Sequence, residues 1–166
     1  METKHNPLII LLTILLIISV GMNINNYTKE SLRRQQYINR LYDAINISII
    51  HIEAYFKNPD DLSSIVYAGK HLNEVYYIIE HHSVSIYSRT FNSAGDYLQS
   101  RHGMSEYDIL SDGIVSEREE EYLQRLLAAL RVTLTKLASE DKPFANRKLS
   151  YKQISSILLD FHMERL

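Results

Sequence analysis

The most apolar stretch of the chain reads LIILLTILLIISV, from Leu8 to Val20, and the uncharged segment continues to Ile24. A helix from Pro7 to Ile24 would be about 27 Å long, close to the roughly 30 Å thickness of the hydrocarbon core of a bilayer. A helix in the interior of a soluble protein rarely has so uniformly apolar a surface. The sequence therefore predicts a membrane-spanning helix or the hydrophobic region of a signal peptide.

The residues around this stretch allow both interpretations. Lys4 supplies a positive charge before the apolar run, and Ser19 and Gly21 offer small side chains for a possible cleavage, as in signal peptides. The match to a cleavage site is poor, so we favour an uncleaved anchor over a cleaved signal and a secreted protein. We divide the chain into an N-terminal signal-anchor or transmembrane segment, residues 1–24, and a helical bundle domain, residues 25–166.

The charges that flank the span bear on its orientation. Four basic side chains follow it within about 20 residues, where positive charge is usually retained in the cytoplasm; they are Lys29, Arg33, Arg34 and Arg40. A short N-terminal tail with a signal-like start, in contrast, usually stays inside while the rest of the chain is exported. We expect a single-pass protein of the cell membrane with its C-terminal domain outside the cytoplasm. The basic side chains also suit contact with anionic lipid headgroups.

Composition excludes several classes of protein. The 166 residues include no cysteine, which rules out disulfides, thiolate metal sites and a cysteine nucleophile. The formal net charge of −2 argues against a general nucleic-acid-binding protein, which would need a basic surface. With 45% hydrophobic residues the chain can fold, while five glycines and three prolines provide little material for a turn-rich β protein.

Beyond the span, apolar residues recur at steps of three and four, which is typical of amphipathic helices. We expect four of them: one over residues 26–58, one that begins after 60 and weakens near 92–95, one over 116–141 and one from 150 onward. No segment alternates as a strand would. The predicted fold is all-α, an N-terminal membrane-spanning or signal helix followed by an antiparallel bundle of about four helices.

Several residues mark the ends of these helices. Asn26 or Thr28 could cap the first helix, and Asn58-Pro59 should end it. The second helix should begin at a cap formed by Asp60 or Asp61. The third and fourth helices should each begin with a capping box, in which a serine and the side chain three residues later satisfy each other's backbone amides; the pairs are Ser116 with Glu119, and Ser150 with Gln153.

The sharpest candidate for a ligand site is the segment from Asp108 to Glu119. Its Asp108, Asp112, Ser116 and Glu119 occupy positions 1, 5, 9 and 12 of an EF-hand calcium loop, and Gly113 occupies position 6. Position 3 is Leu110, which offers no oxygen, and the chain has no partner loop. Gly113 as a turn, followed by the capping box, explains the same residues without metal. We therefore expect no cofactor, and keep calcium as the one metal worth testing.

The chain offers little to catalysis. It contains no GxSxG, no phosphate-binding GxxxxGK[ST] or GxGxxG and no HExxH, and none of its seven histidines stands four residues from another on a helix. We therefore expect a protein that is not an enzyme, and histidines that lie on solvated helix surfaces.

Charge is distributed unevenly along the chain. Residues 106–121 carry a net charge of −6 and residues 131–152 a net charge of +4. These charges could complement each other at the ends of neighbouring helices, or they could form a docking surface. We favour the first interpretation.

One span followed by long amphipathic helices resembles, in architecture only, the extracytoplasmic four-helix sensor of bacterial chemoreceptors. The resemblance implies a helical domain that binds something outside the cell, but a second span and a signalling module are missing, so autonomous signalling is not expected. We expect a membrane-anchored, non-catalytic protein-interaction or scaffold module. The alternatives are a ligand- or calcium-binding sensor subunit and a secreted helical protein. The expected partners are the lipid bilayer and a protein, with self-association left open and nucleic acid excluded.

Overall fold

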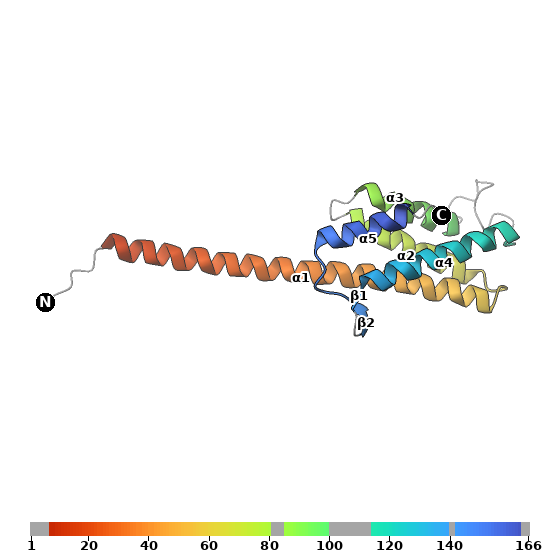
Figure 1. Ribbon diagram of the computed structural model, residues 1–166, viewed down its shortest axis with the longest axis horizontal. Helices are drawn as coiled ribbons and strands as arrows, with labels where there is room; N and C mark the ends of the chain where they lie inside the picture. The colour runs from red at the N-terminus through yellow and green to blue at the C-terminus, as the bar shows by residue number, and fades with distance from the viewer. Residues whose placement is uncertain (1–6, 81–84, 100–113, 140–141, 164–166) are drawn as a thin grey trace. The chain divides into compact units, whose positions relative to one another are not determined.

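The computed structural model of the chain describes residues 7–80, 85–99, 114–139 and 142–163. Its elements, in chain order, are α1 (Pro7–Lys57), α2 (Ser63–Glu80), α3 (Ser85–Gln99), α4 (Glu117–Leu137), β1 (Ala138–Ser139), β2 (Lys142–Ala145) and α5 (Tyr151–Met163) (Figure 1). The predicted all-α, bundle-like fold is confirmed. By internal contacts the chain forms two units, residues 1–36 and residues 37–166, and we call the second the bundle unit.

Helix α1 is longer than the sequence predicted. It begins at Pro7, a residue that suits the first position of a helix because its missing N–H would be unpaired there. The expected start at Asn26 or Thr28 is wrong, because the Thr28 hydroxyl donates to the carbonyl of Ile24 at 2.9 Å inside a continuing helix. The helix ends at Lys57, directly before Asn58-Pro59, as predicted.

Helices α2 and α3 replace the single second helix that the sequence suggested. Asp61 accepts a hydrogen bond from the backbone N–H of Ser63 at 3.2 Å, which confirms it as the acceptor at the start of α2. Helix α2 ends at Glu80, and α3 continues without interruption through the expected break at 92–95. The break is absent because Gly95 lies where α3 crosses α2 at close range: a Cβ there would come within 2.9 Å of the carbonyl oxygen of Gly69.

The region after α4 departs from the prediction of a chain without strands. Helix α4 ends at Leu137, and β1 and β2 follow as a short antiparallel pair in which Ala138 lies opposite Ala145. The backbone N–H of Asn146 donates to the carbonyl of Leu137 at 2.8 Å and extends this pairing. A strand of two residues paired with one of four is too short to produce a readable alternation of apolar and polar residues.

The core of the bundle unit is apolar and draws on every one of its helices. The largest side chains that are fully buried are Phe91, Phe161, Ile38, Leu41, Ile45, Ile52, Ile65, Leu72, Ile79, Leu98 and Leu123. Phe91 of α3 and Phe161 of α5 stack nearly parallel, with ring centroids 4.3 Å apart. Helix α5 is therefore an integral part of the core rather than an appendage.

Candidate functional site

The predicted calcium loop is described by the structure only in its second half. Asp108 and Asp112 lie outside the described residues, so nothing tests their role. Ser116 and Glu119 form the predicted capping box: Glu119 Oε2 accepts from the Ser116 backbone N–H at 2.6 Å and from its hydroxyl at 2.7 Å. Glu119 N–H donates back to Ser116 Oγ at 3.4 Å. The two side chains thus have a structural role at the start of α4, and calcium binding stays a prediction.

We expect Ser116→Ala to lower the free energy of unfolding by about 1 kcal/mol, because the substitution leaves the first turn of α4 without its cap. Urea unfolding in the presence of EDTA measures this loss. The matched control is Ser156→Ala, an exposed position inside α5 where alanine should be neutral or slightly stabilising. A loss that appears only when calcium is present would contradict the purely structural role of Ser116.

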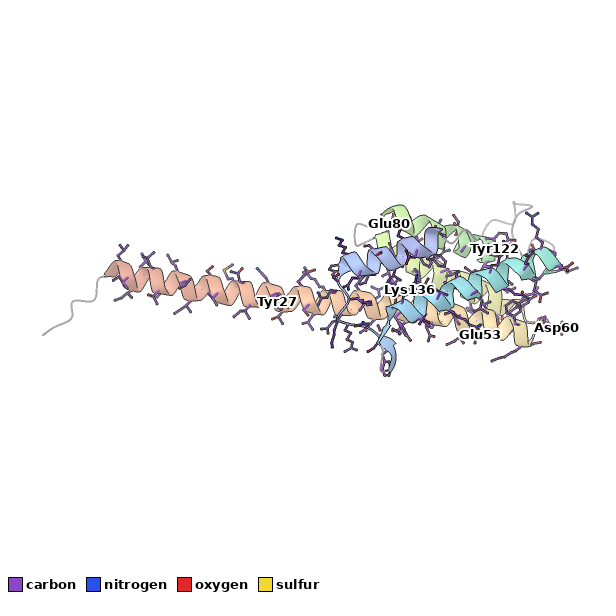
Figure 2. The ribbon with its side chains drawn as sticks, viewed as in Figure 1. Tyr27, Glu53, Asp60, Glu80, Tyr122 and Lys136 are labelled. Carbon is purple, nitrogen blue, oxygen red and sulfur yellow. The ribbon has the colours of Figure 1, made fainter. Side chains whose placement is uncertain are left out.

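The apolar stretch of α1 is exposed around the whole circumference of the helix. Its large side chains retain from 48% exposure at Val20 to 65% at Ile17. Figure 2 shows side chains leaving this part of α1 on opposite sides, with Tyr27 following it. The helix is long and apolar enough to cross a membrane, since its best window has a mean hydropathy of 2.4 and no buried part. A large exposed apolar surface of this kind marks a contact with a membrane or with another protein.

Two histidines from different helices meet on the surface of the bundle unit. The ring of His51 on α1 lies between Tyr67 and His71 of α2, with ring centroids 5.4 Å and 5.9 Å away. His71 Nδ1 lies 3.3 Å from Glu74 Oε2, and Arg40 Nη2 lies 3.9 Å from Glu74 Oε1. Partial burial first, and the electrostatic interaction with His71 second, lower the pKa of His51. These ring contacts of His51 link α1 to α2.

The histidine pair does not form a metal site with the described residues around it. Within residues 7–80, 85–99, 114–139 and 142–163 no three His, Asp or Glu side chains are placed to hold a metal ion. The pair could not be predicted from the sequence, because His51 and His71 are 20 residues apart and only the register between α1 and α2 brings them together. We therefore regard it as a pH-sensitive contact between two helices.

We expect the bundle to lose stability as the pH falls below 6.5, the ordinary pKa of histidine. The folded-state pKa of His51 lies below that value, so the unfolded chain takes up this proton first. The contribution of His51 to the free energy of unfolding is fully present above pH 6.5. It is lost as the pH falls through the pKa of His51 in the folded state. Urea unfolding at about pH 7.5 and about pH 5 measures the change. His51→Gln should reduce it, and an identical change in both proteins would contradict the assignment.

A buried polar contact joins α2 to α3. Asn73, which is 5% exposed, donates from Nδ2 to Asp96 Oδ1 at 3.0 Å, and Asn92 donates to the other oxygen of Asp96 at 3.0 Å. Asn73 Oδ1 has no conventional hydrogen-bond donor and lies 2.2 Å from where a Cβ of Gly95 would be, so it faces the Cα–H of that glycine. The contact fixes the register of the two helices and is not open to a ligand.

Four of the described tyrosines pack in pairs between helices. Tyr37 and Tyr151 lie with ring centroids 5.6 Å apart, and Tyr97 and Tyr122 4.9 Å apart. Burial raises the pKa of Tyr37 and of Tyr122 to about 12, so both hydroxyls remain protonated under ordinary conditions. Pairs of this kind stabilise contacts between helices.

The two charged stretches of the sequence lie at different ends of α4 in their described parts. Glu117, Glu119 and Glu120 occupy its first turn, whereas the basic stretch begins in its second half. Arg131 pairs with Glu53 at 2.7 Å and Lys136 with Asp160 at 2.8 Å. Neither of these partners belongs to the acidic stretch. The complementarity that we favoured from the sequence is therefore not what neutralises these two basic residues.

Comparison with known proteins gives no further guide: no family model, curated protein or solved structure matches the chain.

Proposed function

We propose that this protein is a membrane-anchored helical module, non-catalytic, whose bundle unit lies outside the cytoplasm and binds a partner protein. The observation that carries the anchor is the fully exposed apolar surface of α1 from Leu8 to Ile24. The bundle unit has a closed apolar core of its own, so it does not need this segment in order to fold. A segment that contributes nothing to a core, yet is apolar on all sides, is explained by a bilayer.

Binding rather than catalysis follows from what the described surface offers. The ion pairs of its described residues lie at the surface and join helices, such as Arg131 with Glu53 and Lys136 with Asp160. Several large apolar or aromatic side chains of the bundle unit remain half-exposed, among them Ile50, Tyr67 and Tyr77. Aromatic side chains at a surface are enriched where proteins meet. A partner protein is the occupant that best suits this surface.

The first test is the location of the full-length chain with a C-terminal tag. We expect the chain to remain in the membrane after carbonate washing, at its full mass, and to be digested when protease is added to intact cells. Protection from protease would mean that the basic flank keeps the bundle inside. A soluble product that begins near Met22 would mean a cleaved signal and a secreted bundle, which would contradict the anchor.

The second test addresses the partner. A photo-crosslinking amino acid at Tyr77, which is half-exposed on α2, should yield a discrete crosslinked product in intact membranes. The matched position is Gln124, an exposed polar residue on α4, where we expect no such product. Equal crosslinking at both positions would indicate contact by chance, and crosslinking at neither would remove the main support for the interaction role.

A further inference from the structure

Exposed basic side chains gather at one end of the bundle unit, the end where α1 enters it. They are Arg40 on α1, Arg147 and Lys148 between β2 and α5, and Lys152 in the first turn of α5. Arg147 Nε donates to Asn39 Oδ1 at 3.4 Å, and Tyr151 contacts Tyr37, which places the segment 147–152 beside the start of the α1 portion of this unit. We call Arg40, Arg147, Lys148 and Lys152 the basic end.

Among the residues that the structure describes, few acids lie near the basic end. Within the described ranges Arg147, Lys148 and Lys152 form no ion pair, and only Arg40 has an acidic neighbour, Glu74 at 3.9 Å. The other acids of this end, Asp43 and Glu80, are exposed, and the carboxylate of Glu80 accepts from Tyr76. Counted over the described residues alone, the four cations outnumber the three carboxylates of this end, which leaves it positive.

An exposed aromatic side chain precedes Arg147 by three residues in the chain. Phe144 of β2 is 65% exposed, whereas its neighbour Ala145 is buried and pairs with Ala138. The alternation of a strand holds the two side chains on opposite faces, so the pairing of β2 with β1 keeps Phe144 directed outward. Lys and Arg together with an exposed aromatic ring are the composition of segments that lie at a membrane surface.

We propose that the basic end, with Phe144, docks on the surface of an anionic phospholipid bilayer. The inference rests on the proposed membrane anchor, since only twelve residues of sequence separate Ile24 from Tyr37, where the bundle unit begins. These twelve residues belong to helix α1 and rise about 18 Å, so the connection keeps this end near the headgroups. The far end carries Asp60, Asp61 and the acidic first turn of α4, and anionic lipid repels it (Figure 2).

The absence of cysteine from the chain makes a direct test possible. The full-length Phe144→Cys variant carries one thiol for a polarity-sensitive fluorophore, and Asp60→Cys is the matched control at the far end. Each labelled chain is reconstituted into vesicles of phosphatidylcholine alone or with about 30% phosphatidylserine, and quenching by lipids with a spin label on the acyl chain is measured. We expect quenching at position 144 only in the anionic vesicles, with its loss at high salt, and no quenching at position 60.

Two sets of charge substitutions complete the design. In the Phe144→Cys background, Arg147→Gln, Lys148→Gln and Lys152→Gln together should abolish the quenching. The control variant removes the same charge from exposed positions elsewhere, by Lys57→Gln, Lys70→Gln and Arg118→Gln. It should leave the quenching unchanged. Circular dichroism establishes that both triple variants are folded.

The outcomes separate this inference from the proposed function. A chain that resists carbonate washing but shows the same fluorescence in both kinds of vesicle would contradict the docking and leave the anchor standing. A chain that carbonate removes from both kinds of vesicle would contradict the anchor and, with it, the docking. Quenching that survives the combined loss of Arg147, Lys148 and Lys152 would also overturn the docking.

Discussion

Phe161→Ala is expected to lower the free energy of unfolding of the bundle by about 3–5 kcal/mol. Phe161 is 1% exposed and its ring stacks on Phe91 with centroids 4.3 Å apart, so alanine removes the transfer energy of a whole ring and leaves a cavity. Because Phe91 belongs to α3, the substitution also weakens the contact between α5 and α3. Urea unfolding followed by circular dichroism gives the loss directly.

The chain supplies a control of the same residue type. Phe144 is 65% exposed, and Phe144→Ala should change the stability by no more than about 0.5 kcal/mol. Equal losses at the two positions would show that the stacked pair is not part of the core. A loss at Phe161 together with a smaller denaturant slope would indicate that α5 already detaches before the remainder unfolds.

Gly95→Ala is expected to cost about 3 kcal/mol, at the upper end of the range for overpacking. The added methyl would lie 2.2 Å from Asn73 Oδ1 and 2.9 Å from the carbonyl oxygen of Gly69. Asn73 cannot simply move aside, since it is buried and its amide donates to Asp96. Helices α2 and α3 must then separate, against the usual stabilising effect of alanine over glycine in a helix.

Gly21 provides the matched substitution, because a Cβ there would meet nothing within 4 Å. Gly21→Ala should leave the stability of the bundle unchanged. A double-mutant cycle with Asn73→Ala should recover part of the loss at Gly95, since one of the two obstructing groups is then absent. Purely additive losses would mean that Asn73 does not oppose the methyl group.

The local signals of the sequence were correct where short-range chemistry determines structure. Both capping boxes formed, the second through Ser150 and Gln153, whose side chain accepts from the Ser150 backbone N–H at 2.8 Å. Asn58-Pro59 ended α1 because proline restricts the residue before it. Such features depend on a few neighbouring residues, so a sequence displays them in full.

Features that depend on packing were not visible in advance. Thr28 can cap a helix or bond back inside one, and the sequence alone does not distinguish the two. Gly95 resembled a helix breaker because the approach of α2 that requires a glycine there is a tertiary property. The pairing of His51 with His71 depends equally on the register between α1 and α2. Of the candidate calcium ligands, Ser116 and Glu119 were also predicted as a cap, and that prediction is confirmed.

The stacking of Phe91 on Phe161 has a consequence for the newborn chain. Seventy residues separate the two rings, and a ribosome adding about 5–20 residues per second needs about 4–14 s to cross that distance. Throughout this interval α3 has been synthesised, but Phe161, which covers the ring of Phe91 in the folded protein, has not. If the first segment has entered the bilayer, as proposed, the core of the nascent bundle stays incomplete at the membrane during this interval. A chaperone that covers the exposed apolar surface would then increase the yield of folded protein.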